Sequence, residues 1–383
     1  MANEASSNGG SEASAATGRV VLFGATGYTG DLTARAMVKR GMHPVLAGRR
    51  LEAVEALASE LGGLEIAVAD VSEPASIRGL LQRGDTLVTT VGPFARWGDA
   101  ALDAAIDAGA HYLDSTGEPP FVRKVFEYGG PRAERSGTVA MTAMAYDWVP
   151  GNLTGALALS EAEGAVGVRI GYFATGSGIG GMSGGTRASL MGTLTEPSFQ
   201  FRGGKVMSER GAKKLYAFDV AGKTRQAVSV GTSEAYSLPR VYPGLRDVEV
   251  YLGWFGPQSR AMQVFSFVGA GFTKIPGVRS ATGAIVERFV KTSTGGPDEE
   301  ARKGTRSVFV AEALGSAGEV LSRVETEGIN SYEFSGRVLA WAAEATAAAT
   351  AAQVGAGARG PVEAFGLARL GAGVAECGIS RSH

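Results

Sequence analysis

The chain has 383 residues, of which 44% are hydrophobic and 20% are charged, a composition typical of globular domains and not of disordered chains. Its 37 Lys and Arg residues balance 38 Asp and Glu residues, so no net positive charge attracts nucleic acid, which we exclude as a partner. The single cysteine, Cys377, excludes an internal disulfide, and the three histidines lack zinc-ligand spacing; we expect no metal site and a reducing, cytoplasmic location.

Residues 1–18 are rich in Ser, Ala, Gly and Asn and contain no apolar run. Such a composition cannot bury enough surface to offset the entropy of ordering, which predicts a disordered tail. The tail lacks the basic start and apolar centre of a secretory signal. No later stretch approaches the roughly 18 apolar residues of a membrane span, so we expect a soluble protein, at most peripherally bound to a membrane.

Residues 19–150 alternate short apolar runs, which predict strands, with longer amphipathic runs, which predict helices. The predicted strands are Val20–Phe23, Pro44–Ala47, Leu64–Ala69, Thr86–Val91, His111–Leu113 and Val139–Thr142. The predicted helices are Thr29–Lys39, Leu51–Leu61, Ala75–Gln82 and Ala100–Ala108. Apolar strands separated by helices indicate an α/β fold with a doubly wound, Rossmann-type parallel sheet.

Residues 151–337 carry longer alternating runs, which predict a second, mixed α+β substrate domain with a mostly antiparallel sheet. Its predicted strands are Val166–Ala174, Arg225–Gly231, Arg246–Trp254, Ser307–Leu314 and Val320–Thr326. The Ala-rich segment Val338–Val354 lacks Gly and Pro before its end and predicts a helix. We expect residues 338–383 to form a C-terminal helical segment that returns to pack on the first domain.

A glycine-rich turn, Gly24–Gly30, follows the first predicted strand and opens the first predicted helix. In a dinucleotide site the first glycine permits the tight turn, the second lets the main chain approach a diphosphate, and the third lets helix and strand pack closely. The position of the turn therefore predicts nucleotide binding. The cofactor-binding candidates here are Gly24, Thr26, Gly27, Tyr28, Thr29 and Gly30.

The second predicted strand is followed by Arg49 and Arg50, where an NAD site usually has an acidic residue. Two arginines suit the extra 2′-phosphate of NADP, so we expect NADPH or NADP as the cofactor in preference to NAD. The alternative is that both arginines only begin a solvated helix. Asp70 ends the third strand, where we expect it to lie at the edge of the adenine ring.

The fourth predicted strand runs into Val91, Gly92 and Pro93. Ligands of open α/β sheets lie beyond the carboxyl ends of the strands, so we expect this segment beneath the nicotinamide. The alternative is that the Gly-Pro pair only forms a loop.

Five segments follow one another along the chain: GATGYTG, AGRR, TTVGPFARWG, AGAHYLDSTGE and AMAYDWVPGNL. They resemble the saccharopine-dehydrogenase-like oxidoreductases, and are most similar to the bacterial branch that includes the trans-acting enoyl reductases of polyketide-lipid synthesis. The resemblance covers residues 19–153, returns weakly at SGGTRAS and at GPVEAFGLARLGAGV, and is poor over residues 193–337.

The resemblance implies an NAD(P)-binding Rossmann domain, a mixed second domain that carries the substrate, and a dinucleotide in the cleft between them. It also implies that AGAHYLDSTGE lines the cleft, which makes Asp114 a cofactor-binding candidate and Gly117 and Glu118 further site candidates. The family often has Gly-Phe-Asp where this chain has Ala145-Tyr146-Asp147, so the hydroxyl of Tyr146 is a feature of this chain.

Hydride transfer requires orientation of the nicotinamide and a proton source for the reduced bond. The catalytic candidates near the predicted cleft are Tyr146, Asp147, Glu118 and His111. Three of them also have a structural interpretation, because His111 suits a strand interior, Asp147 a turn and Glu118 a helix start.

Two other patterns have simpler interpretations. Gly181–Gly185 fits the G-x-S-x-G elbow of hydrolases, but the only downstream histidine is His383, so we interpret the match as chance. The apolar run Met262–Pro276 is interpreted as core, with the lining of a cleft for a bulky apolar substrate as the alternative.

Together these patterns predict an NADP(H)-dependent oxidoreductase that reduces a double bond of a hydrophobic, carrier-bound substrate, with an enoyl C=C bond as the first choice over C=N or C=O. A saccharopine- or opine-type C–N dehydrogenase and a non-catalytic NADPH-sensing module that holds a partner are the alternatives. A homodimer stays open.

Overall fold

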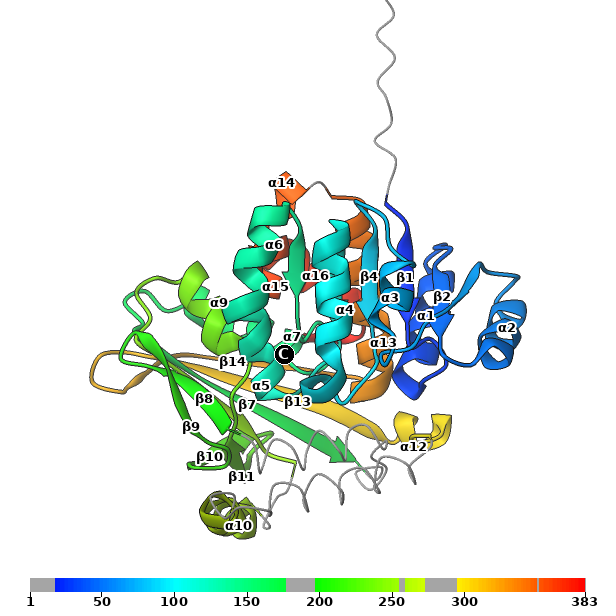
Figure 1. The fold of residues 1–383 in the computed structure, drawn as a ribbon. Coiled ribbons are helices and arrows are strands. Elements are labelled where there is room, and N and C mark those ends of the chain that lie inside the picture. The colour runs from blue at the N-terminus through cyan, green and yellow to red at the C-terminus, as the bar shows by residue number, and fades with distance from the viewer. Residues whose placement is uncertain (1–17, 177–196, 255–258, 273–294, 350, 383) are drawn as a thin grey trace, which may run out of the picture.

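The computed structural model describes residues 18–176, 197–254, 259–272, 295–349 and 351–382. Two β-sheets lie one above the other in this part of the chain, and helices surround the upper sheet (Figure 1). The G-x-S-x-G segment at 181–185 and almost all of the predicted tail lie outside the described residues.

The first sheet is parallel in every pairing and has the strand order β15-β6-β5-β4-β1-β2-β3. Its strands are β1 Val20–Phe23, β2 Val45–Gly48, β3 Ile66–Val68, β4 Thr86–Thr89, β5 His111–Asp114, β6 Val139–Met141 and β15 Gly357–Ala358. The four central strands are buried on both faces, which explains their unbroken apolar sequences. The predicted Rossmann-type sheet is confirmed.

Helices cover both faces of this sheet. On one face α1 (Tyr28–Lys39) packs against α13 (Ser331–Ala347), and on the other α3 (Pro74–Arg78), α4 (Phe94–Ala108) and α6 (Gly130–Ser136) lie together. Helix α2 (Leu51–Glu60) flanks the sheet, and α5 (Pro119–Lys124) continues through a π-helical turn, Val125–Gly129, into α6. The sequence did not predict the helices between β5 and β6.

The second sheet has the order β10-β11-β12-β7-β13-β14-β16, with β8 pairing with β12 and β9. Its strands are β7 Gly167–Gly176, β8 Pro197–Arg202, β9 Lys205–Arg210, β10 Leu215–Val220, β11 Lys223–Ser229, β12 Asp247–Leu252, β13 Thr305–Leu314, β14 Val320–Gly328 and β16 Ile379–Arg381. Within this second sheet, the β12–β7 pairing is the only parallel one among the described strands. The predicted, mostly antiparallel sheet is therefore confirmed.

Helix α7 (Val149–Ser160) lies between the two sheets and packs on β7, β13 and β14. Ten of its twelve residues are buried, and apolar side chains surround its axis. Helix α9 (Glu234–Val241) packs beside it, as do α15 (Pro361–Phe365) and α16 (Leu367–Glu376). A helix that is apolar on all sides belongs in a protein interior, and here that interior is the junction of the two sheets.

The apolar run Met262–Pro276 falls partly in α10 (Ser259–Phe272), where Val264 and Phe267 are 62% and 69% exposed. These two side chains are not core, and the residues after 272 in this run lie outside the described part. No described helix combines the length and the apolar character needed to cross a membrane.

The C-terminal segment returns to the first sheet as predicted, although α13 begins seven residues before the predicted helix and ends at Ala347, with α14 (Ala351–Val354) after it. The side chain of Asn330 caps α13 by accepting from the amides of Tyr332 and Glu333. The segment then adds β15 to the first sheet and β16 to the second, which joins both halves. The domain boundaries at 150 and 337 stay predictions.

The contact between α1 and α13 depends on Gly336, because a Cβ atom there would lie 2.9 Å from the backbone carbon of Leu32. We expect Gly336→Ala to lower the free energy of unfolding by about 1–3 kcal/mol, since backbone must move. Gly371→Ala, in α16, is the matched control because its Cβ would meet only Leu153 Cδ1 at 3.8 Å. The control should be neutral or stabilising by up to about 1 kcal/mol. Chemical unfolding of both variants measures the difference, and equal effects would contradict the packing argument.

Candidate functional site

The turn after β1 is shaped by two glycines. Gly24 has a φ of +91°, and a Cβ there would lie 2.8 Å from both Thr90 Oγ1 and Val91 Cγ2. A Cβ at Gly30 would lie 2.1 Å from the Gly24 carbonyl oxygen. Gly24 thus lets the turn approach the segment after β4, and Gly30 lets α1 pack against the turn, as predicted from their spacing.

The amino end of α1 fits a diphosphate. Gly27 is exposed, it is the N-cap residue of α1, and no side chain caps the helix there. The first-turn amides have no intrahelical acceptor and the helix dipole makes this end positive. Thr26 and Thr29 are half-buried at the same turn, and the Thr26 Oγ1 lies 3.7 Å from the position of a Cβ at Gly48, at the end of β2.

Arg49 and Arg50 follow β2 and are exposed, while Asp70 follows the neighbouring strand β3. The Asp70 carboxylate accepts the backbone amide and the hydroxyl of Ser72, both at 2.8 Å. These two hydrogen bonds lower the pKa of Asp70, and the charge of Arg49 lowers it further. The structure therefore brings the predicted 2′-phosphate and adenosine residues to one corner of the sheet.

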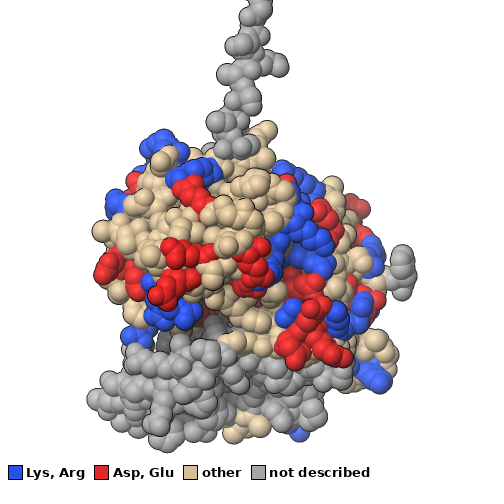
Figure 2. Space-filling model, turned by 90° about the vertical axis from the view of Figure 1, so that its right-hand side faces the viewer, with Lys and Arg blue, Asp and Glu red and all other residues tan. Residues whose placement is uncertain are grey.

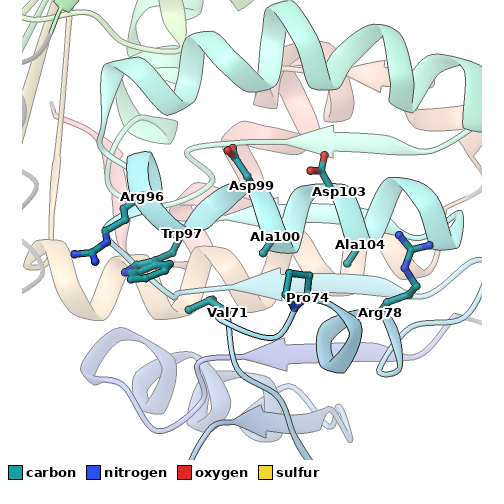
Figure 3. A pocket seen from close by; sticks show the side chains of 9 residues that line it. All are labelled: Val71, Pro74, Arg78, Arg96, Trp97, Asp99, Ala100, Asp103 and Ala104. Carbon is teal, nitrogen blue, oxygen red and sulfur yellow. The ribbon is translucent and has the colours of Figure 1, made fainter.

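A groove of about 340 Å³ opens beside this corner, between α3 and α4. Figure 3 shows Val71 and Pro74 on one side of it and Trp97 and Ala100, of α4, on the other, with Arg96 next to Trp97. The Arg96 guanidinium carbon lies 4.5 Å from the centroid of the Trp97 ring. These two residues were not among the predicted site residues, although an arginine and an aromatic residue directly after the fourth strand are a signal for a surface that binds a ring.

The loops at the ends of β4, β5 and β6 are held by two buried carboxylates. Glu118 accepts the amides of Phe94 and Ala95, both at 2.9 Å, and so caps α4 just after Gly92 and Pro93. Asp114 accepts the amides of Ala143 at 2.8 Å and Thr116 at 2.9 Å.

Burial raises the pKa of Asp114 to about 6. Both carboxylates accept backbone amides, Asp114 through Oδ1 alone with its buried Oδ2 unsatisfied among the described residues, so their observed role is to hold the loops that surround the site. Their predicted roles in cofactor binding and catalysis stay predictions.

Asp147 lies in the loop between β6 and α7. Its Oδ2 lies against Gly117, where a Cβ would approach it to 2.6 Å, so only glycine fits there. Its Oδ1 is buried and has no hydrogen-bond partner among the described residues. Burial raises the pKa of Asp147 to about 7. A buried carboxyl with an unsatisfied oxygen at the carboxyl edge of a parallel sheet is a candidate proton donor.

The other two catalytic candidates are Tyr146 and His111. Tyr146 is buried beside Asp147, and its ring contacts Tyr172, Trp254 and Phe309 with centroids 5.3–6.1 Å apart. Burial raises the pKa of Tyr146 well above its usual value of 10.

His111 begins β5, at the edge of the sheet opposite the carboxyl ends, and its Nδ1 accepts the amide of Val139 at 3.2 Å. Burial lowers the pKa of His111. The structure therefore does not bring His111 together with the other candidates.

Two site residues, Tyr172 and Glu234, carry no signal in the sequence. The Tyr172 hydroxyl accepts the amide of Gly151 at 2.9 Å and donates to Glu234 Oε1 at 2.7 Å. Glu234 is fully buried, and burial, with a smaller contribution from the charge of Asp147, raises the pKa of Glu234 to about 7. The junction therefore holds two carboxyl groups, Asp147 and Glu234, that disfavour each other's ionisation.

Charges of both signs lie intermixed on the described part of the face in Figure 2. Arg35 pairs with Asp31 and Glu60, and Arg40 pairs with Glu344 and Glu376. Exposed pairs of this kind neutralise the surface and contribute little to stability.

Residues 20–141 match the family model described as the saccharopine dehydrogenase NADP binding domain. The chain carries a saccharopine dehydrogenase NADP-binding domain. The predicted resemblance and the predicted cofactor, NADP(H), are confirmed, while the individual residues that hold the cofactor stay predictions.

Curated relatives match part of the chain. A protein of Mycobacterium tuberculosis, provisionally named a trans-acting enoyl reductase, is 36% identical over 188 residues, which are 47% of this chain and 45% of that protein. A trans-acting enoyl reductase of Mycobacterium ulcerans is 34% identical over 35% of this chain and 34% of its own. The match thus spans less than half the length of these relatives. Both findings support the predicted class of NAD(P)-dependent oxidoreductase.

Among solved structures, the apo saccharopine dehydrogenase (L-Glu forming) of Saccharomyces cerevisiae superposes with a TM-score of 0.58 at 11% identity. The superposition covers 95% of this chain and 99% of that chain. At this identity the likeness concerns the fold, and it confirms a Rossmann-type domain followed by a second domain with its own sheet.

Glu234, outside the NADP-binding domain, should make stability depend on pH. Its pKa is about 7 in the folded chain against an ordinary 4.5, so its neutral form favours folding below about pH 4.5 and this contribution is lost as the pH rises through 7. We expect Glu234→Gln to remove this loss, which makes the variant about 1–3 kcal/mol more stable, relative to the wild type, at pH 8 than at pH 4.5. Urea unfolding at both pH values measures it. The exposed Glu163→Gln is the matched control, and an equal change in both variants would contradict the assignment.

Proposed function

We propose that this chain is an NADP(H)-dependent oxidoreductase that reduces an enoyl C=C bond in a hydrophobic, carrier-bound acyl substrate. The observation that carries the proposal is Asp147, a half-buried residue whose Oδ1 is buried and unsatisfied at the carboxyl edge of an NADP-binding sheet. The names of the curated relatives support the enoyl assignment.

The residues around the turn suit three successive parts of the cofactor. The uncapped amides at Gly27 suit the diphosphate, the cations Arg49 and Arg50 suit the 2′-phosphate, and the groove between Val71 and Trp97 suits the adenine ring. Bound NADPH supplies a hydride to one carbon of the double bond.

The second carbon of the double bond requires a proton. Asp147 is the acid proposed to donate it, because a pKa of about 7 keeps much of this carboxyl protonated near neutral pH. After donation the carboxylate is reprotonated from water, so each turnover consumes one hydride and one proton. Gly117 permits the position of the carboxyl, since any side chain there would displace Asp147.

The neighbours of Asp147 support an apolar substrate. The ring of Tyr146 packs in the core with Trp254 and Phe309, which makes the junction beside Asp147 aromatic and apolar. Aromatic walls bind acyl chains and enoyl groups by burial of apolar area. A substrate that is a dicarboxylate amino acid would require several cations beside the Asp147 carboxyl.

A substrate panel tests the proposal. The purified chain is mixed with NADPH and either enoyl-pantetheine thioesters of increasing chain length or a 2-oxo acid with an amine, and NADPH absorbance is followed. Consumption with the enoyl thioesters is expected, with rates that rise with chain length. Consumption only with the oxo acid and amine would replace the proposal by a C–N dehydrogenase, and NADPH binding without consumption by any substrate would favour a sensing module.

Asp147→Asn should lower turnover by about a hundredfold, because the amide cannot donate the proton, while NADPH affinity stays within about twofold. Turnover of the wild type should fall as the pH rises through about 7, where Asp147 loses its proton, and this fall should be absent in the variant. Tyr146→Phe is the matched comparison in the neighbouring residue and should change turnover by less than about threefold. A Phe variant as impaired as the Asn variant would transfer the role to Tyr146.

Replacing Arg49 and Arg50 by alanine should weaken NADPH binding by about 10- to 100-fold and leave NADH binding unchanged, because only NADPH carries the 2′-phosphate. Fluorescence titration of both cofactors gives the two dissociation constants. Arg323→Ala, on β14 of the second sheet, is the control, since this exposed arginine pairs with Glu325 at 3.0 Å. Equal losses for both cofactors would contradict 2′-phosphate recognition.

A further inference from the structure

A guanidinium group from outside the NADP-binding domain lies at the phosphate turn. It belongs to Arg302, in α12 (Glu299–Lys303), which lies below α1 in Figure 1. Arg302 Nη1 donates to the hydroxyl of Tyr28 and to the carbonyl of Pro297, both at 3.0 Å. The Tyr28 hydroxyl also donates to the Pro297 carbonyl. We call these three residues the Tyr28 clasp.

The clasp is packed as well as hydrogen-bonded. A Cβ at Gly296 would lie 2.6 Å from the Tyr28 ring, so the backbone of the 295–304 segment lies directly on that ring. On another side Tyr332 contacts the ring edge-on at a centroid distance of 5.1 Å. Tyr28 is the first residue of α1, so the 295–304 segment is fixed to the element whose amides fit the diphosphate.

The charge of Arg302 is not balanced within the clasp. Its two acceptors are neutral oxygens, its Nε is buried without a partner, and within the described ranges it forms no ion pair with a carboxylate. The adjacent Lys303, by contrast, pairs with Glu299 at 2.6 Å. A cation next to the positive end of a helix is unfavourable unless an anion joins them.

We propose that Arg302 is a positioning residue for the diphosphate of the dinucleotide, acting through Tyr28 from outside the NADP-binding domain. The inference rests on the proposed function, because it requires a dinucleotide at this turn. The negative charge of the diphosphate would offset both the helix end and the guanidinium. Cofactor binding would then stabilise the clasp, and the clasp would raise affinity for ligands that carry a diphosphate.

Two probes separate this role from the rest of the site. NADPH carries the diphosphate and the 2′-phosphate, whereas adenosine 2′-monophosphate carries only the latter. We expect Arg302→Met to weaken NADPH binding by about 5- to 10-fold, as for loss of one nearby charge in partly solvated surroundings, and to leave adenosine 2′-monophosphate binding within about twofold. Arg302→Lys should recover most of the NADPH affinity because it restores the charge.

Lys303→Met is the matched control, since this neighbouring cation is exposed and already paired, and it should change neither affinity. Unchanged NADPH affinity in Arg302→Met, or equal losses for both probes, would overturn the inference. If thermal unfolding shows that Arg302→Met is destabilised, Tyr28→Phe decides: it keeps the ring packing, loses the hydroxyl, and should weaken only NADPH binding. Unchanged NADPH affinity in Tyr28→Phe would then overturn the inference. A wild-type chain that binds neither probe would instead refute the proposed function.

Discussion

The structure depends on the burial of α7 between the two sheets. A buried helix must find partners for its first amides, and Trp148, its N-cap residue, offers no side-chain acceptor. Tyr172 of β7 supplies one by accepting the amide of Gly151. The same hydroxyl donates to Glu234, so the second sheet and α9 are tied to the start of α7 by one buried phenol. The polar network at the junction is therefore a consequence of placing a helix end where water cannot reach it.

This burial also determines the chemistry available at the edge of the first sheet. Asp147 lies two residues before α7, the helix that the second sheet covers, and its Oδ1 is buried. Burial raises its pKa to about 7, and the charge of Asp147 in turn adds to the raised pKa of Glu234. A carboxyl with a pKa near 7 is suited to donate and recover a proton near neutral pH. The packing that holds the two halves together would thus also raise the pKa of Asp147, the proposed acid.

The sequence predicted the first sheet well because its central strands are buried on both faces and bounded by turn residues, and it located the glycine turn and the arginine pair by their positions in that pattern. It missed α7, whose apolar residues surround the axis and leave no helical period to detect. Glu234 and Tyr172 could not be found, since only tertiary contact joins residues 62 positions apart. His111 was chosen by chemistry alone, without the strand direction that puts it at the opposite edge.

Charge along the carboxyl edge supports one direction for the dinucleotide. At the β2 end Arg49 and Arg50 are exposed cations, whereas at the β5 and β6 end the buried Asp114 and the half-buried Asp147 are acids with raised pKa values. A 2′-phosphate at the β5 and β6 end would lie beside acidic groups. It would lose its hydration there without a cation to compensate. The nicotinamide of NADPH is uncharged and loses little there. The same asymmetry that would select NADP over NAD would therefore also orient it, with the hydride-donating ring beside Asp147 and away from the arginines.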